Sequence, residues 1–339
     1  MKTPAYNTLH YIKPGIDMRN TFPPGLQNHR GFARTFQPGK LTLGLIAPFM
    51  GYADSPFPDM ADFPALVKQA DHSGLGALWV RDVPFYDPSF GDVGQIYDIT
   101  ATLGYLSAVT ENITLGAAGY VSPLREPILT AKEAASIDQL SGGRFILGLA
   151  GGDRPGEYPA FGKSFDNRAE RFQENWRTIR RLTEQPFPQF STEHGGRFHG
   201  NLDLVPKPVQ GRLPMMTVGR ARQDLSWIAN ESDGWLWYSA DLPHLKKMMA
   251  ELDRLNQSDI WRPFATGNFV ELLENSHAPL QVFNSIYLRS GSKALADFYS
   301  QQAEAGVAHI IANLKPTRRP PLETMQDFLE NIVSQFQAG

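Results

Sequence analysis

The stretch "EPILTAKEAASIDQLSGGRFILGLAGG" (residues 126–152) decides the fold, because it holds one complete helix-to-strand unit. Pro127 suits the first turn of a helix, and Ser141 and Gly142 suit its end. The segment "RFILGLA" (144–150) is apolar after its first residue, as expected for a strand buried on both faces. The unit therefore predicts a parallel sheet covered by helices.

The same alternation recurs eight times along the chain. The expected strands are 41–48, 75–82, 113–121, 144–150, 214–219, 234–239, 262–274 and 307–314. The expected helices are 59–74, 92–112, 126–140, 166–184, 221–232, 241–257, 290–306 and 321–336. Eight such units favour a closed (β/α)8 TIM barrel over an open doubly wound sheet.

Two segments depart from this rhythm. Residues 1–40 are rich in Pro, Gly, Asn and Arg, and we interpret them as an irregular N-terminal arm. Such an arm is either a flexible end or a cover packed over the barrel or a partner. Residues 187–214 predict a hairpin-like insertion after the fourth helix, within a single barrel domain of residues 41–339.

Composition excludes several classes of protein. The 339 residues carry a formal net charge of −3, without the basic excess of a nucleic-acid binder. No cysteine is present, which excludes disulfides, thiolate metal sites and cysteine nucleophiles. The eight histidines show no metal-binding spacing, so no metal is expected. No apolar run approaches about 18 residues, so we expect no membrane span and a cytoplasmic location.

Candidate site residues follow from the barrel, whose chemistry lies at the carboxyl ends of its strands. These ends carry Pro48 and Phe49, Arg81 and Asp82, Ala118 and Gly119, Gly151 and Gly152, Gly219, Arg220 and Ala221, Trp237 and Tyr238, and Asn313.

Two of these strand ends are richest in glycine. Gly151 and Gly152 either let a ligand approach closely or simply turn the chain into a loop. "VGRARQDLSW" (218–227) runs from a strand end into a helix start and carries Arg220 and Arg222. This combination predicts a phosphate site, with a solvated pair of arginines as the alternative.

Three stretches carry a family likeness. They are "ENITLGAAGYVSPLREPILTAKEAASIDQLSGGRFILGLAGG" (111–152), "EYPAFG" (157–162) and "LVPKPVQGRLPMMTVGRARQDLSWIANESDGWLWYS" (204–239). Together they resemble the bacterial luciferase-like flavin monooxygenases over roughly residues 41–330. The resemblance implies a (β/α)8 barrel that binds FMN or, in some members, a deazaflavin.

The resemblance also implies roles for individual positions. Ala118 and Gly119 match a place where the family often has a non-proline cis peptide against the flavin ring. The turn 219–221 matches the phosphate-contacting turn, and Gly151 and Gly152 match a segment near the phosphate or ring edge. Trp237 and Tyr238 lie near enough to a strand end to line a flat pocket, and Pro48 and Phe49 are further candidates for cofactor contact.

One stretch departs from the family pattern. Luciferases have a catalytic histidine after strand two, whereas "WVRDVP" (79–84) has Arg81 and Asp82 there. Light emission from a long-chain aldehyde is therefore not expected. We assign Arg81 and Asp82 to orienting the flavin or substrate, with Asp82 as a candidate base.

The function implied by the resemblance is oxygenation of a small organic substrate. FMN, supplied as FMNH2 by a separate reductase, would activate O2 at the flavin C4a position. The alternatives are a deazaflavin-dependent hydride-transfer enzyme and a non-catalytic flavin-binding protein.

Assembly is the last expectation. The helix at 92–112 is apolar on more than one side, which is typical of a helix buried twice. The resemblance implies a homodimer through helices two and three. Cover by the N-terminal arm is the alternative.

Overall fold

Eight parallel strands close into a barrel in the computed structural model, which describes residues 21–49, 57–90, 97–194 and 196–336. Each strand pairs in parallel with both neighbours, and the last pairs with the first. In order around the barrel they are β1 (Thr42–Ala47), β2 (Ala77–Val80), β3 (Thr114–Ala117), β5 (Phe145–Ala150), β8 (Met215–Val218), β9 (Trp235–Tyr238), β10 (Phe264–Leu272) and β13 (His309–Asn313). The predicted (β/α)8 barrel is confirmed.

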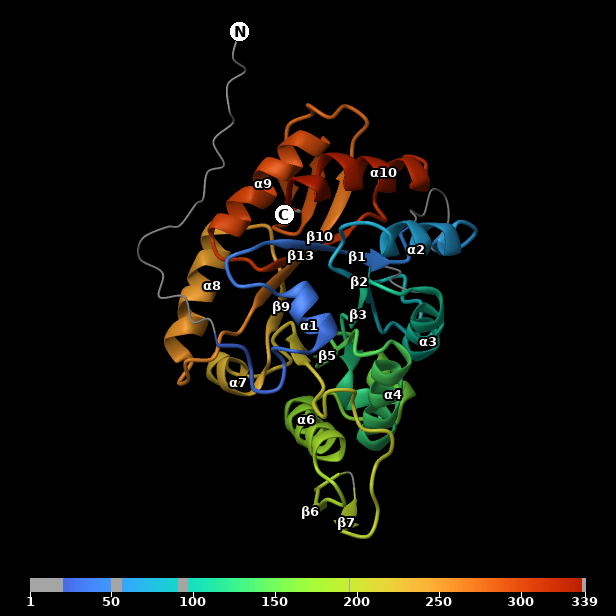
Figure 1. Cartoon of the computed structure of the whole chain (residues 1–339), viewed down its shortest axis with the longest axis vertical. Coiled ribbons are helices and arrows are strands. Elements are labelled where there is room, and N and C mark those ends of the chain that lie inside the picture. The colour runs from blue at the N-terminus through green and yellow to red at the C-terminus, as the bar shows by residue number, and fades with distance from the viewer. Residues whose placement is uncertain (1–20, 50–56, 91–96, 195, 337–339) are drawn as a thin grey trace.

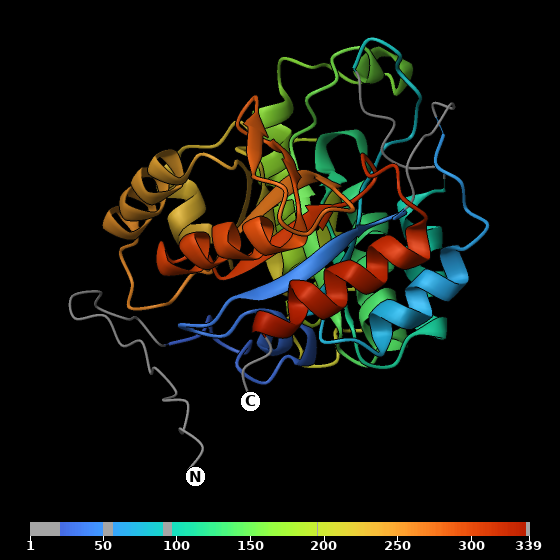
Figure 2. The same ribbon diagram turned by 90° about the horizontal axis from the view of Figure 1, so that it is seen from above.

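Helices surround this ring of strands (Figure 1). They are α2 (Phe63–Asp71), α3 (Ile99–Val109), α4 (Pro127–Leu140), α6 (Arg168–Glu184), α7 (Leu225–Glu231), α8 (Leu242–Leu255), α9 (Ser292–Glu304) and α10 (Pro321–Asn331). The last helix, α10, lies beside α2 and so completes the outer layer (Figure 2).

One helix is shorter than expected at its start. α3 begins at Ile99 because the Asp98 carboxylate accepts a hydrogen bond from the Ala101 N–H, at 2.9 Å. Residues 91–96, which belong to the expected helix 92–112, lie outside the described residues.

The strands are buried on both faces, and successive side chains enter two different cores. On β13, Ile310 and Ala312 pack with the helices, whereas Ile311 packs with Trp79 and Met216 inside the barrel. This double burial explains why the strand sequences are continuously apolar rather than alternating.

The described part of the N-terminal arm closes the amino-terminal end of the barrel. Its helix α1 (Arg30–Thr35) lies near the middle of the ring of strands (Figure 1). Leu26, Phe32 and Phe36 are fully buried and pack with the side chains inside the barrel. The sequence left open whether the arm is a flexible end or a cover packed on the barrel. Residues 21–36 form a packed cover.

The turn between α4 and β5 follows its sequence closely. Gly142 and Gly143 have φ of +66° and +78°, and the Gly143 N–H donates to the Asp138 carbonyl at 2.8 Å. This confirms the predicted left-handed helix end. Arg144 is 2% exposed and donates to the Thr110 hydroxyl and to the carbonyls of Thr110 and Ile113, each at 2.8 Å. It therefore ties β3 to β5 at the closed end of the barrel.

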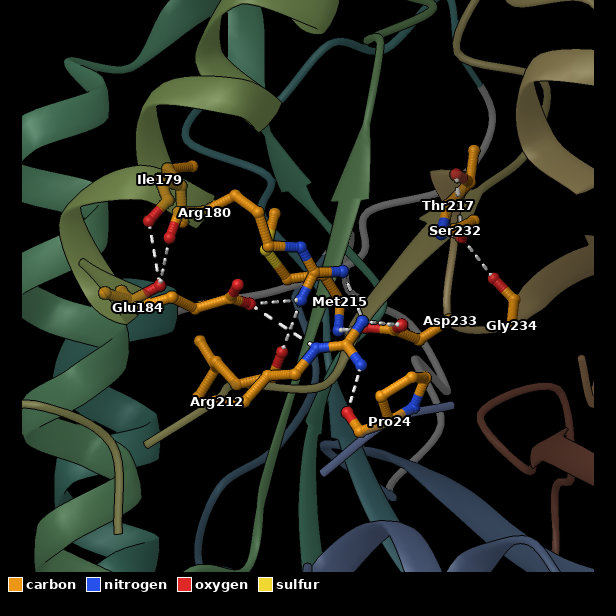
Figure 3. A network of polar contacts seen from close by, with 12 residues as sticks. Pro24, Ile179, Arg180, Glu184, Arg212, Met215, Thr217, Ser232, Asp233 and Gly234 are labelled. Carbon is orange, nitrogen blue, oxygen red and sulfur yellow. Dashed lines mark hydrogen bonds and ion pairs between the residues drawn. The ribbon is translucent and has the colours of Figure 1, made fainter. Parts of the chain in front are cut away.

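A second polar network joins α6, β8 and β9 to the arm (Figure 3). The buried Asp233 carboxylate accepts from Arg180 at 2.7 Å, from Arg212 at 2.5 Å and from the Met215 N–H at 2.9 Å. Arg212 also donates to the Pro24 carbonyl. These three hydrogen bonds, two of them from positively charged arginines, compensate for burying the negative charge of the Asp233 carboxylate.

Two hairpins are added to the barrel. β6 (Gln189–Ser191) and β7 (Arg197–His199) pair antiparallel, as the insertion predicted, and project away from the barrel (Figure 1). A second hairpin, β11 (Gln281–Phe283) and β12 (Tyr287–Ser290), was not predicted. β12 extends β10 as an extra parallel strand beyond the barrel.

Candidate functional site

A cavity of about 690 Å³ opens at the carboxyl ends of the strands. All eight barrel strands, or the loops that follow them, contribute to its wall. Of the residues expected in the site, the following line it: Arg81, Asp82, Ala118, Gly119, Gly151, Gly152, Gly219, Arg220, Ala221, Trp237, Tyr238 and Asn313.

Pro48 and Phe49 are not among the lining residues. Phe49 is 5% exposed, and its ring stacks on Phe63 of α2 with centroids 6.0 Å apart. Its large apolar side chain gains more from the core between β1 and α2 than from the cavity. The geometry therefore does not support these two positions as cofactor contacts.

The floor of the cavity is backbone. The Ala118–Gly119 peptide bond is cis, as predicted, and β4 (Tyr120–Val121) resumes pairing with β5 after it. A Cβ atom at Gly119 would lie 2.8 Å from both the Gly148 carbonyl oxygen and Val218 Cγ2. The missing side chain thus lets three neighbouring strand ends approach one another closely at the cavity wall.

The turn after β8 has the backbone of an anion site. Gly219, Ala221 and Arg222 have φ of +65°, +46° and +59°, so three residues of one turn are left-handed. A Cβ at Gly219 would meet nothing within 4 Å, so this glycine is needed for its left-handed conformation rather than for space. Its N–H donates to the Leu236 carbonyl at 2.9 Å. Arg220 and Arg222 are exposed at the same wall.

The two glycines after β5, Gly151 and Gly152, are required because neighbouring atoms leave no room for a side chain. A Cβ at Gly151 would lie 2.9 Å from Ala221 Cα, and one at Gly152 would lie 2.6 Å from Val121 Cγ1. Both positions are therefore fixed by the close approach of neighbouring turns. The sequence offered ligand approach or a simple turn. The φ of +71° at Gly152 bears out the turn, and close packing against Ala221 and Val121 adds a second reason for glycine at both positions.

The cavity is strongly cationic on one side. Arg154 and Arg168 join the arginines of the β8 turn, and both are largely buried. Arg154 stacks over the Phe90 ring at 4.2 Å, and Arg168 stacks over Phe165 at 3.3 Å. The strand-end rule placed Arg154 among the candidates after strand four without giving it a role. It did not select Arg168, which starts a helix. Their only signal was their position after strand four.

The carboxyl group of Glu157 lines the cavity beside these arginines, and the Tyr158 phenol lies next to it in the chain. Burial raises the pKa of the Glu157 carboxyl, although Arg154, with its Nη1 4.0 Å from Oε1, acts against this. Burial also raises the pKa of Tyr158 to about 12, and its hydroxyl donates to the Gly151 carbonyl at 2.5 Å. Tyr158 therefore stays protonated and holds the turn after β5.

Asp82 is engaged by its own chain. Its carboxylate accepts from Arg125 Nε and Nη2, both at 2.8 Å, and from the Val121 N–H at 2.9 Å. Burial lowers the pKa of Arg125, but the hydrogen bonds and charge of Asp82 outweigh this and raise it. The geometry favours Asp82 as a positioning residue that fixes β4 at the cavity floor, rather than as a base. Arg81 lines the cavity beside it.

Outside the cavity, Glu174, Glu193 and His194 bring possible metal-binding atoms within 4.8 Å of one another. The Glu174 carboxylate already accepts from the backbone N–H groups of Glu193 and His194, both at 2.9 Å. The cluster therefore anchors the β6–β7 hairpin to α6. Across the described ranges, no helix is long and apolar enough to cross a membrane.

Comparisons with known proteins identify the family of the chain. The model of the luciferase-like monooxygenases matches residues 38–260, so the chain belongs to that family. An uncharacterized protein of Mycobacterium tuberculosis (strain ATCC 25618 / H37Rv) is 30% identical over 215 residues, 59% of this chain and 73% of that one. The alkanal monooxygenase alpha chain of Photorhabdus luminescens is 26% identical over 164 residues, 48% of this chain and 44% of that one.

Solved structures share the fold. The monooxygenase RslO1 from Streptomyces bottropensis superposes with a TM-score of 0.72 at 15% identity, covering 87% of this chain and 99% of that one. An F420-dependent secondary alcohol dehydrogenase, in complex with an F420–acetone adduct, superposes with a TM-score of 0.68 at 17% identity. That match covers 86% of this chain and 98% of the dehydrogenase.

Proposed function

We propose that this protein is a flavin-dependent monooxygenase that binds FMN in the cavity and oxygenates a small organic substrate. The observation that carries the proposal is the pairing of a left-handed cationic turn, Gly219–Arg222, with a wall at Ala118–Gly119 that carries no side chain larger than a methyl group. The first suits a phosphate group and the second suits a planar ring. Family membership supports the same assignment.

The residues present fit FMN. The side chains of Arg220 and Arg222 would hold the phosphate, and Gly219, which has no Cβ, would leave room for it. Trp237 and Tyr238 line the cavity next to the floor and would border the ring. Reduced FMN, when bound, supplies the electrons that activate O2.

The chain's own part in the reaction is orientation and exclusion of water. Asp82 and Arg125 hold β4, and with it the cavity floor, in one position. Phe90, Phe165 and Phe269 line the wall and limit the access of water to the reacting atoms. We further propose that a separate reductase supplies the reduced flavin, as the resemblance to the family implies.

Titration with FMN and with the deazaflavin F420 tests the cofactor. We expect tighter binding of FMN, followed by absorbance. Tighter binding of F420 would instead favour a hydride-transfer enzyme. Oxidation of reduced FMN by O2 without product from any substrate would favour a flavin-binding protein.

Replacing Arg220 tests the phosphate turn. The Arg220→Glu variant should bind FMN at least about tenfold more weakly, because it removes a charged donor and places a negative charge beside the phosphate. The control is Arg197→Glu, which makes the same charge change on the exposed β7 strand, away from the cavity. An unchanged dissociation constant in Arg220→Glu would remove this turn from the site.

A further inference from the structure

The cavity also has an apolar wall. In the circular order of strands, this wall lies across the barrel from β5 and β8, whose ends carry Arg154, Arg220 and Arg222. It is formed by β1, β10 and β13 and by the loop before β12, through Ile46, Phe269, Ile286 and Ile311. Among the described residues of this wall, none carries a positive charge. Asn313, at the end of β13, pairs in register with Phe269 and brings one polar side chain into this apolar surface.

Asn313 points inward by the alternation of its strand. Ile311 packs inside the barrel, and residue 313 repeats its orientation one pleat further along. The residue is only 4% exposed, although it lines the cavity. Its side chain is therefore reachable from the cavity and not from the outer surface.

The amide of Asn313 has a defined orientation. The Lys315 N–H donates to its Oδ1 at 3.3 Å, so the oxygen must face that backbone group and the Nδ2 must face the other way. Within the described chain, Nδ2 has no hydrogen-bond partner and is not sealed off by neighbouring atoms. Asn268 contrasts with it, because both amide atoms of Asn268 are enclosed.

We propose that Asn313 is a ligand-binding residue whose Nδ2 donates a hydrogen bond to an uncharged carbonyl oxygen of the molecule bound in the cavity. A neutral donor in an apolar wall favours a neutral acceptor, because a carboxylate would lose its hydration without gaining a cation there. The acceptor has two possible sources: a ring carbonyl of the flavin, or the carbonyl of an aldehyde or ketone substrate. The inference rests on the proposed function only where the acceptor is a carbonyl of the flavin ring.

The test uses the full-length protein with two variants. Asn313→Leu removes the donor at similar size, and Asn313→Asp replaces it with an acceptor while keeping a partner for the Lys315 N–H. Asn201→Asp, at an exposed position of the insertion, is the control. Thermal unfolding of all variants confirms that each is folded. The probes are FMN, F420, acetophenone and ethylbenzene, the last two differing in one carbonyl oxygen.

We expect both Asn313 variants to bind a carbonyl-bearing probe about fivefold to tenfold more weakly than the wild type does, with ethylbenzene unaffected. Weaker flavin binding identifies the cofactor as the source, and weaker acetophenone binding alone identifies the substrate. Dissociation constants within about twofold of wild type for every probe would overturn the proposal.

The two proposals fail separately. If the wild type binds neither flavin, the proposed function falls, and the preference for acetophenone over ethylbenzene still decides the role of Asn313. If the wild type binds a flavin and the Asn313 variants match it for every probe, only the role of Asn313 falls. If the wild type binds none of the probes, both are overturned.

Discussion

His309 shows how a single polar residue is accommodated inside the barrel. It is fully buried on β13, where its Nε2 accepts from Trp79 Nε1 at 2.9 Å and its Nδ1 lies 2.7 Å from the Thr42 hydroxyl. The Thr42 hydroxyl in turn donates to the Thr35 carbonyl. The ring therefore carries its single proton on Nδ1 and is neutral. Burial lowers the pKa of His309 to about 3.

This depressed pKa predicts a loss of stability in acid. An unfolded histidine has a pKa of about 6.5, so between that pH and about 3 the unfolded chain binds one more proton than the folded chain. The His309 contribution should lower the free energy of unfolding by about 1.4 kcal/mol for each pH unit below about 6. Comparing urea unfolding of the wild type and His309→Gln from pH 8 to pH 4 measures it.

Glutamine can keep one donor and one acceptor at this position but does not titrate. The stability difference between wild type and variant should therefore change with pH only in the acidic range. Parallel pH profiles for the two proteins would show that His309 is not the titrating group.

At the scale of elements, α1 contributes to the barrel core although it precedes the first strand. Phe32 is fully buried, and its ring lies 5.0 Å from Phe36 and 6.2 Å from Phe22. The helix start is held by His29, whose Nδ1 accepts from the Phe32 N–H while its Nε2 lies 3.2 Å from Asp138 of α4. α1 is thus fixed both by apolar packing and by a buried polar pair.

Truncating Phe32 should be costly. Phe32→Ala should lower the free energy of unfolding by about 3–5 kcal/mol, the usual range for removing a buried phenylalanine side chain. Phe187→Ala, at a position 59% exposed, is the matched control and should change it by less than about 0.5 kcal/mol. A loss below about 1 kcal/mol in Phe32→Ala would mean that α1 unfolds independently of the barrel.

The sequence predicted those elements whose pattern is local. The eight strands were visible because a doubly buried strand is apolar throughout, and the end of α4 was visible because two glycines follow it. The β11–β12 hairpin was missed because its strands are short and mostly exposed and its turn uses Asn284 and Ser285 in left-handed conformations rather than glycine. No local signal marked that turn.

For the candidate site, the position of a residue at a strand end predicted whether it lines the cavity. The sequence did not predict which side chains contact one another. The strand-end rule placed twelve of the fourteen expected residues on the cavity wall. It could not show that Asp82 is held by Arg125, which is 43 residues away in the chain. It also could not show that Phe49 turns toward α2, because both faces of a barrel strand end are open to an apolar side chain.

At the scale of the whole molecule, one flank of the barrel is unusually apolar. Tyr105 and Val109 of α3 and Ile128, Leu129 and Leu140 of α4 are 36–69% exposed. Residues 21–36 of the arm lie at the end of the barrel and leave these side chains uncovered. We propose that this flank forms the interface of a homodimer, in line with the expectation from the sequence.

Sedimentation equilibrium at micromolar concentration should give twice 37.8 kDa. Leu129→Glu should shift the mass toward that of the monomer, because it places a charge in the centre of the apolar flank. Leu202→Glu makes the same change at an exposed residue of the insertion and should leave the mass unchanged. A wild-type monomer across this concentration range would reject the dimer.

The closing of the barrel by the arm has a consequence for the order of events during synthesis. Residues near the beginning of the chain bond to much later ones: the Trp261 N–H donates to the Thr21 carbonyl, and Arg212 donates to the Pro24 carbonyl. A ribosome adding about 5–20 residues per second needs roughly 10–50 s to pass from the first of these partners to the last. Leu26, Phe32 and Phe36 leave the ribosome before the strands that enclose them exist. This apolar segment is therefore made before the strands that enclose it and is buried only after they have formed.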